Sequence, residues 1–322
     1  MRTFVQLGFL CLLLIGCRED FIITNPPEQA FDFNIFSELS PNQVVSLELR
    51  EITPIGQPLQ PFNRRDAHVL FSGLNVPGGS LEMVYNSTSE KYLLLREDFR
   101  VSEGFSYDIS IVIPEEGMDT ITATATIPSA VRIENVNFIR SERIPIDNEF
   151  SHFEVELVIR LSEPKVRPAY YRFEPYRLES VLKIRNGVVS VVDVPNKSPF
   201  DVIEVKNNQN AIGSFEHREG LIIEESRLTE NEIHLLMRTR EPLRDGDIVD
   251  VTDEGKEVLT RLQLEMHTLS EEIYEFDRFV DEQLVNQGNS VPNPARIVSN
   301  IENASGVFAG SSKTVVFPRI AD

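Results

Sequence analysis

The chain has 322 residues, which is enough for two domains of ordinary size, and 41% of them are apolar, so it can build hydrophobic cores. Its formal net charge of −20 repels phosphate backbones, which argues against nucleic acid as a partner and favours solubility outside the cell. The two cysteines, Cys11 and Cys17, both lie in a segment that we expect to be removed or modified. We therefore expect neither a disulfide nor a thiolate metal site.

The start of the chain has the pattern of a lipoprotein signal. After one arginine, the run Phe4–Ile15 is mostly apolar but shorter than the roughly 20 residues that cross a membrane as a helix. The run closes on Leu14, Ile15, Gly16 and Cys17. The small Gly16 suits a cleavage site, and the thiol after it can accept lipid chains that hold a protein at a membrane. We predict a signal peptide at 1–16, lipidation of Cys17 and a tether over 17–30; the alternative is an ordinary signal peptide with a chance cysteine.

Residues 31–130 are predicted to form an immunoglobulin-like β-sandwich, because about seven short alternating runs in some 100 residues are typical of that fold. In the clearest run, the odd-numbered residues from Phe105 to Ile113 are apolar. In the next, isoleucine and alanine alternate with threonine from Ile121 to Ile127, and Pro114–Asp119 supplies a hairpin loop. The earlier runs are Phe31–Phe36, Val44–Leu49, Val69–Phe71, Leu81–Tyr85 and Tyr92–Leu95.

Residues 131–322 are predicted to form a second β-rich domain. Phe153–Leu161 alternates with period two, and Asn186-Gly187 between two strand-like runs is a strong hairpin signal. Further strands are expected at Ile233–Met237 and Leu262–Met266, with a final pair at 306–310 and 315–317.

One helix is predicted near 270–287. Ile273, Phe276, Val280 and Leu284 form an apolar stripe with helical spacing, which we expect to pack on a sheet. Thr268 or Ser270 is the expected N-cap, with Thr268 and Glu271 placed as a capping box. The fold class is thus mostly β, a sandwich followed by a β-rich domain that carries one C-terminal helix.

The search for catalytic spacing gives no candidate residues. The histidines are His68, His152, His217, His234 and His267. No two of them are four residues apart, and we expect ordinary surface or sheet-face side chains. Asp245, Asp247 and Asp250 are a weak calcium candidate, but the ligand pattern of a calcium loop is incomplete, and a polar turn is the alternative. We therefore predict no catalytic residue, no metal site and no cofactor.

The aromatic residues Tyr170, Tyr171, Phe173 and Tyr176 allow two interpretations. They can line a groove for a glycan or peptide, or alternate members can pack inward while Arg172 and Arg177 face solvent. We favour packing, because aromatic side chains in strands usually belong to a core.

Four stretches together resemble a known family. They are Thr122–Pro128, Tyr170–Arg172, Leu262–Phe276 and Ser299–Gly310, the last of which reads S-N-I-E-N-A-S-G-V-F-A-G. They are similar to the domain-of-unknown-function 4249 lipoproteins of Bacteroidota. The resemblance implies an outer-membrane lipoprotein associated with TonB-dependent receptors, and it brings no assigned catalytic residue. Glu19 and Asp20, just after Cys17, also resemble the signal for export of such lipoproteins to the cell surface.

From these observations we expect a non-catalytic outer-membrane lipoprotein, exposed at the cell surface, that is an accessory of a TonB-dependent transporter. The first alternative is a surface lipoprotein that binds a glycan or peptide on its own. The second is a hydrolase whose residues come together from distant loops.

Overall fold

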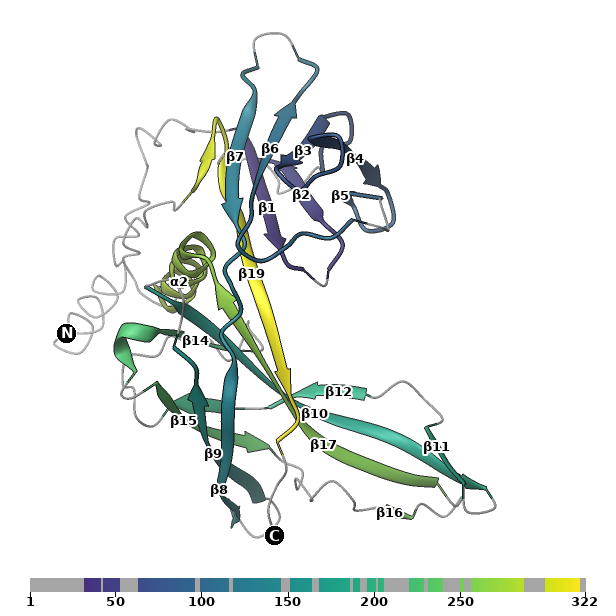
Figure 1. The fold of residues 1–322 in the computed structure, drawn as a ribbon, viewed down its shortest axis with the longest axis vertical. Helices are drawn as coiled ribbons and strands as arrows, with labels where there is room; N and C mark the ends of the chain where they lie inside the picture. The colour runs from purple at the N-terminus through teal and green to yellow at the C-terminus, as the bar shows by residue number, and fades with distance from the viewer. Residues whose placement is uncertain are drawn as a thin grey trace, which may run out of the picture.

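The computed structural model describes residues 32–41, 43–52, 63–95, 99–115, 118–145, 151–163, 168–185, 188–191, 196–200, 202–205, 220–228, 231–239, 250–251, 256–286 and 299–318. The molecule is elongated, with one β-rich unit at each end and helix α2 beside the junction between them (Figure 1). The prediction of a mostly β chain with one C-terminal α-helix is confirmed.

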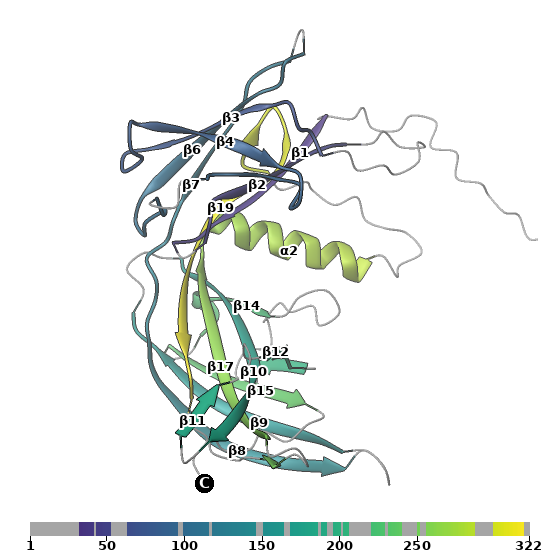
Figure 2. The same ribbon diagram turned by 90° about the vertical axis from the view of Figure 1, so that its right-hand side faces the viewer.

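The first unit is a β-sandwich. Its strands are β1 (Phe33–Leu39), β2 (Ser46–Glu51), β3 (His68–Gly73), β4 (Ser80–Asn86), β5 (Lys91–Leu93), β6 (Ser106–Val112) and β7 (Ile121–Thr126). Strand β5 pairs with both β2 and β4 and so links two layers, which cross above α2 in Figure 2. The predicted runs correspond to these seven strands.

Side-chain alternation decides which face of each strand is buried. In β7, Ile121, Ala123 and Ala125 are buried, while the threonines between them lie toward solvent, as the sequence indicates. In β6, Tyr107 is buried, but Phe105 lies just before the strand and is 39% exposed, so it does not share the buried face as predicted.

The second unit is built on long strands that pair with one another. They are β8 (Ile133–Pro145), β9 (Ser151–Leu161), β10 (Tyr170–Arg185), β11 (Val188–Val191), β12 (Asn196–Pro199), β13 (Val202–Val205), β14 (Leu221–Glu224), β15 (Glu232–Thr239), β16 (Asp250–Val251) and β17 (Lys256–Leu269), with a 3-10 turn η1 (Glu225–Arg227). Strand β10 pairs with β17 along fourteen residues and with β11 in the register Arg185↔Val188. That register fits the predicted two-residue hairpin connection, whose residues Asn186 and Gly187 lie outside the described ranges.

A four-stranded sheet of β13, β15, β9 and β8 packs against one face of β10 and β17. The core between them includes Leu157 and Leu235 from the small sheet and Phe173 and Leu264 from the long strands. This core is separate from the core of the first unit.

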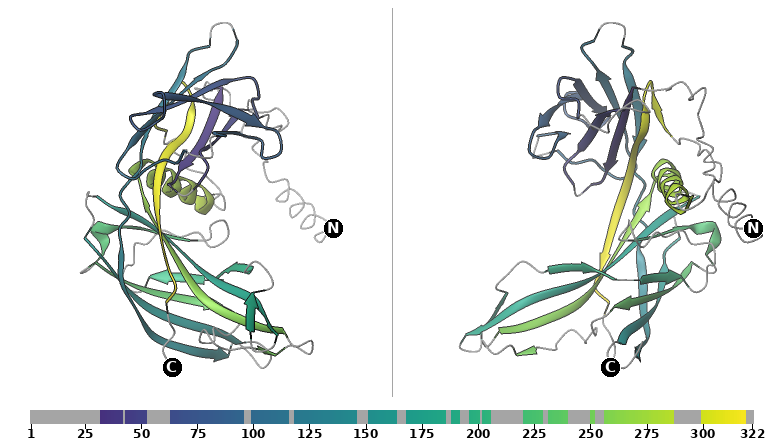
Figure 3. Two further views of the ribbon diagram at one scale, coloured as in Figure 1. Left: turned by 45° about the vertical axis from the view of Figure 1, so that its right-hand side comes forward. Right: turned by 180° about the vertical axis from the view of Figure 1, so that it is seen from behind.

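The last long strand, β19 (Ser305–Val316), belongs to both units. It pairs in parallel with β1 and antiparallel with β17, and in Figures 1 and 3 it runs from the sandwich into the second unit. The predicted pair of short strands at 306–310 and 315–317 is wrong, since one continuous strand covers the polar run between them. Ser311 and Ser312 in that run are 1% and 0% exposed. These polar residues are therefore buried within the strand and do not form the predicted break between two strands.

The segment that carries the N-I-E-N-A-S-G pattern is a hook that fastens β19 to the sandwich. Strand β18 (Ile301–Glu302) pairs with β7, and the Asn300 amide bonds both the N–H and the C=O of Phe308, at 3.0 and 2.6 Å. The Asn303 amide donates to the Thr120 carbonyl at 2.9 Å. Ile301 and Phe308 enter the core of the first unit, although the sequence places them in the predicted second domain.

Helix α2 (Glu271–Asn286) covers the face of β10, β17 and β19 that is opposite the second core. Ile273 is buried there, Tyr274 stacks on Tyr170 at 4.2 Å between ring centroids, and Phe276 contacts Phe36 of β1 at 5.8 Å. The predicted packing on a sheet is therefore confirmed for Ile273 and Phe276.

The predicted capping box is wrong. Thr268 lies inside β17, and its hydroxyl accepts a hydrogen bond from the Val131 N–H at 3.0 Å, which joins the start of the second unit to this strand. Ser270, the other predicted candidate, directly precedes the helix, and its carbonyl accepts a hydrogen bond from the Tyr274 N–H at 3.2 Å.

Gly306 allows β19 to approach β1, and we predict that Gly306→Ala is severely destabilising. Its φ is +112°, and a Cβ there would overlap the backbone carbonyl of Ile35. We expect a loss of about 3 kcal/mol or more in the free energy of unfolding, measured by urea denaturation.

Gly78→Ala is the matched control, because Gly78 also has a positive φ, +77°, but a Cβ there meets no atom within 4 Å. Its expected cost is about 1 kcal/mol. Equal losses in the two variants would show that the contact with β1 is not what requires glycine at 306.

Candidate functional site

The face of the long strands just beyond α2 carries charged side chains instead of a hydrophobic core. Cross-strand register places Arg172 opposite His267, Glu174 opposite Glu265 and Tyr176 opposite Gln263, all on this face. We call the following eight residues the charged network: Glu38, Arg172, Glu174, Lys197, Glu265, His267, Asp277 and Lys313.

Arg172 is the central cation of the network, and its side chain is only 15% exposed. Its guanidinium lies 2.9 Å from Glu38 of β1, 2.9 Å from Glu174 of its own strand and 3.5 Å from Asp277 of α2. One planar, always-charged side chain thus joins the sandwich, the second unit and the helix.

Glu265 is the second centre, and its side chain is 6% exposed. Lys197 from β12 approaches it at 3.0 Å and Lys313 from β19 at 3.4 Å, and the Gln263 amide also donates to it. Lys197 lies 3.4 Å above the centre of the Tyr176 ring as well, which is a cation–π contact.

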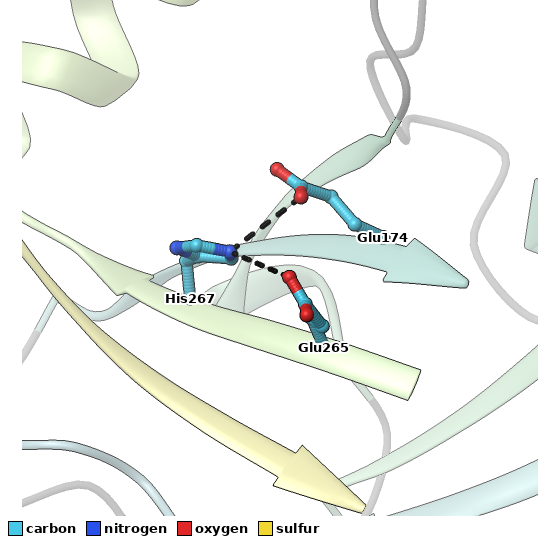
Figure 4. A group of neighbouring side chains, drawn as sticks. All are labelled: Glu174, Glu265 and His267. Carbon is cyan, nitrogen blue, oxygen red and sulfur yellow. Dashed lines mark ion pairs between the residues drawn. The ribbon is translucent and has the colours of Figure 1, made fainter. Parts of the chain in front are cut away.

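His267 lies beside Glu174 and Glu265, with its ring directed at both carboxylates (Figure 4). Its Nε2 atom is 3.6 Å from Glu174 and 4.0 Å from Glu265, and the residue is 5% exposed. Neither ring nitrogen has a hydrogen-bond partner within 3.5 Å. An imidazole buried without partners is costly, so this side chain stands out from the rest of the network.

The surroundings fix the charge of the carboxylates. Burial alone would raise the pKa of Glu174, but the His267 ring, the Arg172 guanidinium and the Tyr176 hydroxyl lower it to about 2. Burial likewise opposes ionisation of Glu38, and Arg172 and the Ser311 hydroxyl lower the pKa of this carboxyl below its usual value. Burial lowers the pKa of Arg172, but Glu38, Glu174 and Asp277 raise it further above its usual value.

The carboxylate of Glu174 stays charged near neutral pH. A general acid or base works best when its pKa lies near the working pH, whereas Glu174 is ionised far below it. The chemistry that the network offers is coordination, by two carboxylates and one imidazole whose ligand atoms all lie within 4.8 Å of one another.

Most of the sequence-predicted site residues lie outside the part of the chain that the structure describes. Leu14, Ile15, Gly16 and Cys17, as well as Asp245 and Asp247, lie outside the described residues, and only the backbone of Asp250 is described, in β16. His217 also lies outside, and only the backbone of His152 is described. His68, with a side chain 70% exposed, and His234, at 36%, are surface residues as expected.

The aromatic residues are buried, as favoured from the sequence: Tyr171 and Phe173 pack in the second core and Tyr170 packs beside α2, whereas Tyr176 lies on the charged face. Tyr170, Tyr171, Phe173 and Tyr176 are between 0% and 7% exposed, so they do not line an open groove. The expectation that Arg172 faces solvent is wrong, because Glu38 and Asp277 come from other elements to bury it. Arg177 is partly buried.

Sequence reasoning also missed the position of His267. It lies on a sheet face, but this face is covered, and the residue is surrounded by charge. The sequence does indicate a polar strand face here. Glu265 and His267 alternate with Leu264 and Met266, so the two polar side chains lie on the same face of the strand. That Glu174 lies opposite depends on the register of two strands some 90 residues apart, which local patterns do not reveal.

The fold and this network define a class: a two-unit, mostly β protein in which the first and last strands pair and a buried ionic cluster lies at the junction. Within the described ranges, no helix has the length and apolar character that crossing a membrane requires. The family described as domain of unknown function (DUF4249) matches residues 35–315, and the chain belongs to that family. No curated protein matches the chain.

Among solved structures, the chain is similar to a partial N-terminal region of an enterococcal surface protein, with 9% identity, coverage of 75% of this chain and 91% of that one, and a TM-score of 0.18. It is also similar to the BSP domain of a biofilm-associated protein, with 6% identity, coverage of 89% and 59%, and a TM-score of 0.16. A structure titled as a chaperone–tip adhesin complex of CFA/I fimbriae gives 7% identity, coverage of 77% and 87%, and a TM-score of 0.18. At such TM-scores these likenesses carry no argument about this chain.

We predict that Arg172→Ala lowers the free energy of unfolding by about 3–5 kcal/mol, because Glu38 and Asp277 would stay buried without their counter-charge. Urea denaturation measures the change. Arg160→Ala is the control, since the Arg160 side chain is 58% exposed in its pair with Glu232, and its expected cost is under about 1 kcal/mol. Similar costs for both variants would contradict a special role for Arg172.

We also predict that stability falls with acid between about pH 4.5 and pH 2. The folded-state pKa values of Glu38 and Glu174 are lowered from 4.5, so their stabilisation is complete above pH 4.5 and is lost as they are protonated at lower pH. Denaturation curves across this range should show the decline, and Glu38→Gln should make it shallower. An unchanged slope in Glu38→Gln would contradict the assignment.

Proposed function

We propose that this protein is lipid-anchored in the outer membrane, faces the cell surface and is a non-catalytic accessory of a TonB-dependent transporter. The observation that carries the proposal is the sequence Leu14-Ile15-Gly16-Cys17 at the end of a short apolar segment. Such a segment has the pattern of a signal peptide. Two or three acyl chains on one cysteine anchor a protein stably in a membrane, because each buried methylene contributes roughly 0.8 kcal/mol.

The length of chain between the lipidated cysteine and the first strand suits a protein that works beside another membrane protein. The first strand begins at Phe33, sixteen positions after Cys17. A fully extended chain of that length reaches at most about 55 Å. The folded units can therefore lie over the outer face of a neighbouring barrel while the lipids stay in the bilayer.

The charged network supports a binding role more than a catalytic one. The two carboxyls of the network whose pKa values shift, Glu38 and Glu174, both shift downward. Glycoside cleavage needs a carboxyl whose pKa is raised so that it carries a proton near neutral pH. This contrast favours a binding role over the hydrolase alternative.

A stand-alone binding module is the second candidate, and one surface feature favours it. A hollow of about 380 Å³ on the outer face of β6 and β7 is lined mainly by hydroxyl, amide and carboxylate groups, including Asp108, Thr124 and Asn300. Such groups suit a polyhydroxylated ligand. Saturable binding of a glycan or peptide by the purified chain alone would favour this candidate over the accessory role.

The experiment is purification of the full chain from its own membranes in mild detergent, with Cys17→Ala as the control variant. We expect the intact mass to show loss of residues 1–16 and acyl chains on Cys17, and a TonB-dependent barrel to co-purify with the wild type. The variant should lose the lipid and most of the barrel. An unmodified Cys17 would overturn the anchor, and a lipidated protein without a barrel would overturn the partnership alone.

A further inference from the structure

Glu174, Glu265 and His267 have the geometry of an incomplete coordination shell (Figure 4). The Nε2 atom of His267 faces both carboxylates, at 3.6 and 4.0 Å, which is longer than a hydrogen bond. Its residue is 5% exposed, and neither ring nitrogen has a hydrogen-bond partner. A buried polar side chain directed at two acceptors without bonding either of them calls for an additional group between them.

The spacing suits a metal ion. Bonds of about 2.0–2.1 Å in a tetrahedral shell place ligand atoms roughly 3.3 Å apart. The observed separations from His267, 3.6 and 4.0 Å, exceed that by about 0.3 and 0.7 Å, which side-chain rotations can close. The scaffold is stiff, because Glu265 and His267 are on one face of β17 and Glu174 is directly opposite Glu265 on β10.

The charges of the network permit a cation at this position. Its four carboxylates exceed its three permanent cations by one charge when the imidazole is neutral. The lysines that now pair with Glu265 are the most exposed cations of the network, with side chains of Lys197 and Lys313 at 37% and 25%, so they can turn into solvent. Arg172 would keep Glu38 and Asp277, and a divalent ion would neutralise the two remaining glutamates.

We propose that Glu174, Glu265 and His267 bind one divalent transition-metal ion, with Zn²⁺ as the best match. One imidazole and two carboxylates suit zinc and its neighbours in the first transition row, whereas Ca²⁺ and Mg²⁺ prefer shells made of oxygen alone. Three protein ligands leave a position open for water or for a ligand donated by another molecule. The site is distinct from the calcium candidate at Asp245, Asp247 and Asp250, and it does not rest on the proposed transporter partnership.

The test is zinc titration of the full chain, purified and stripped with EDTA, by calorimetry near neutral pH, followed by zinc X-ray absorption. We expect one ion per chain and a first shell that contains one imidazole nitrogen at about 2.0 Å. His267→Ala should weaken binding about 100-fold or more. His68→Ala is the matched control and should bind as the wild type does, since His68 also lies 3.6 Å from a glutamate, Glu82, but is 70% exposed.

Two outcomes overturn the proposal: no saturable binding by the wild type, or equal affinities for the wild type and His267→Ala. If His267→Ala does not fold, the X-ray absorption of the wild type decides, because a shell without an imidazole nitrogen also overturns it. Glu265→Gln, which keeps the size of the side chain, should weaken binding as well, and unchanged affinity in this variant would exclude Glu265 as a ligand.

Discussion

The structure depends on the parallel pairing of its first and last long strands. Strand β1 meets β19 in the register Asn34↔Ser305 to Leu39↔Gly310, which joins residues some 270 positions apart. Because β19 also pairs with β17, the sandwich and the second unit share this strand. The same pairing places Glu38 where Arg172 reaches it, so the backbone register creates the charge contact across the junction.

The charged network is a consequence of this arrangement. The strand face just beyond α2 carries ionic side chains that are largely buried, and buried charges have to be paired. Arg172 and the lysines satisfy most of the carboxylates, and Tyr176 and Gln263 add hydrogen bonds. His267 is the member whose ring the surrounding protein leaves unsatisfied, which is why it carries the metal proposal.

Local patterns predict local structure well in this chain. The alternation of Ile121, Ala123 and Ala125 with threonine defines β7, and the change of period at Ser270 marks the start of α2. The features that local patterns fail to predict depend on residues far away in the sequence. Ser311 and Ser312 look like a break between two strands, but both are buried inside one strand that pairs with β17. Arg172 and His267 look like surface residues of amphipathic strands, and only the pairing of β10 with β17 shows that they meet.

The hook at Asn300 and the strand that follows it have a consequence for biosynthesis. The amino-terminal sandwich has strands β1 to β7 by residue 126, but β1 keeps an open edge until β19 has been synthesised. Such an edge is a template for pairing with other chains, and closing a loop of this length is slow. Until then this edge favours pairing with other chains, and termination before the hook would leave the sandwich without β18 and β19.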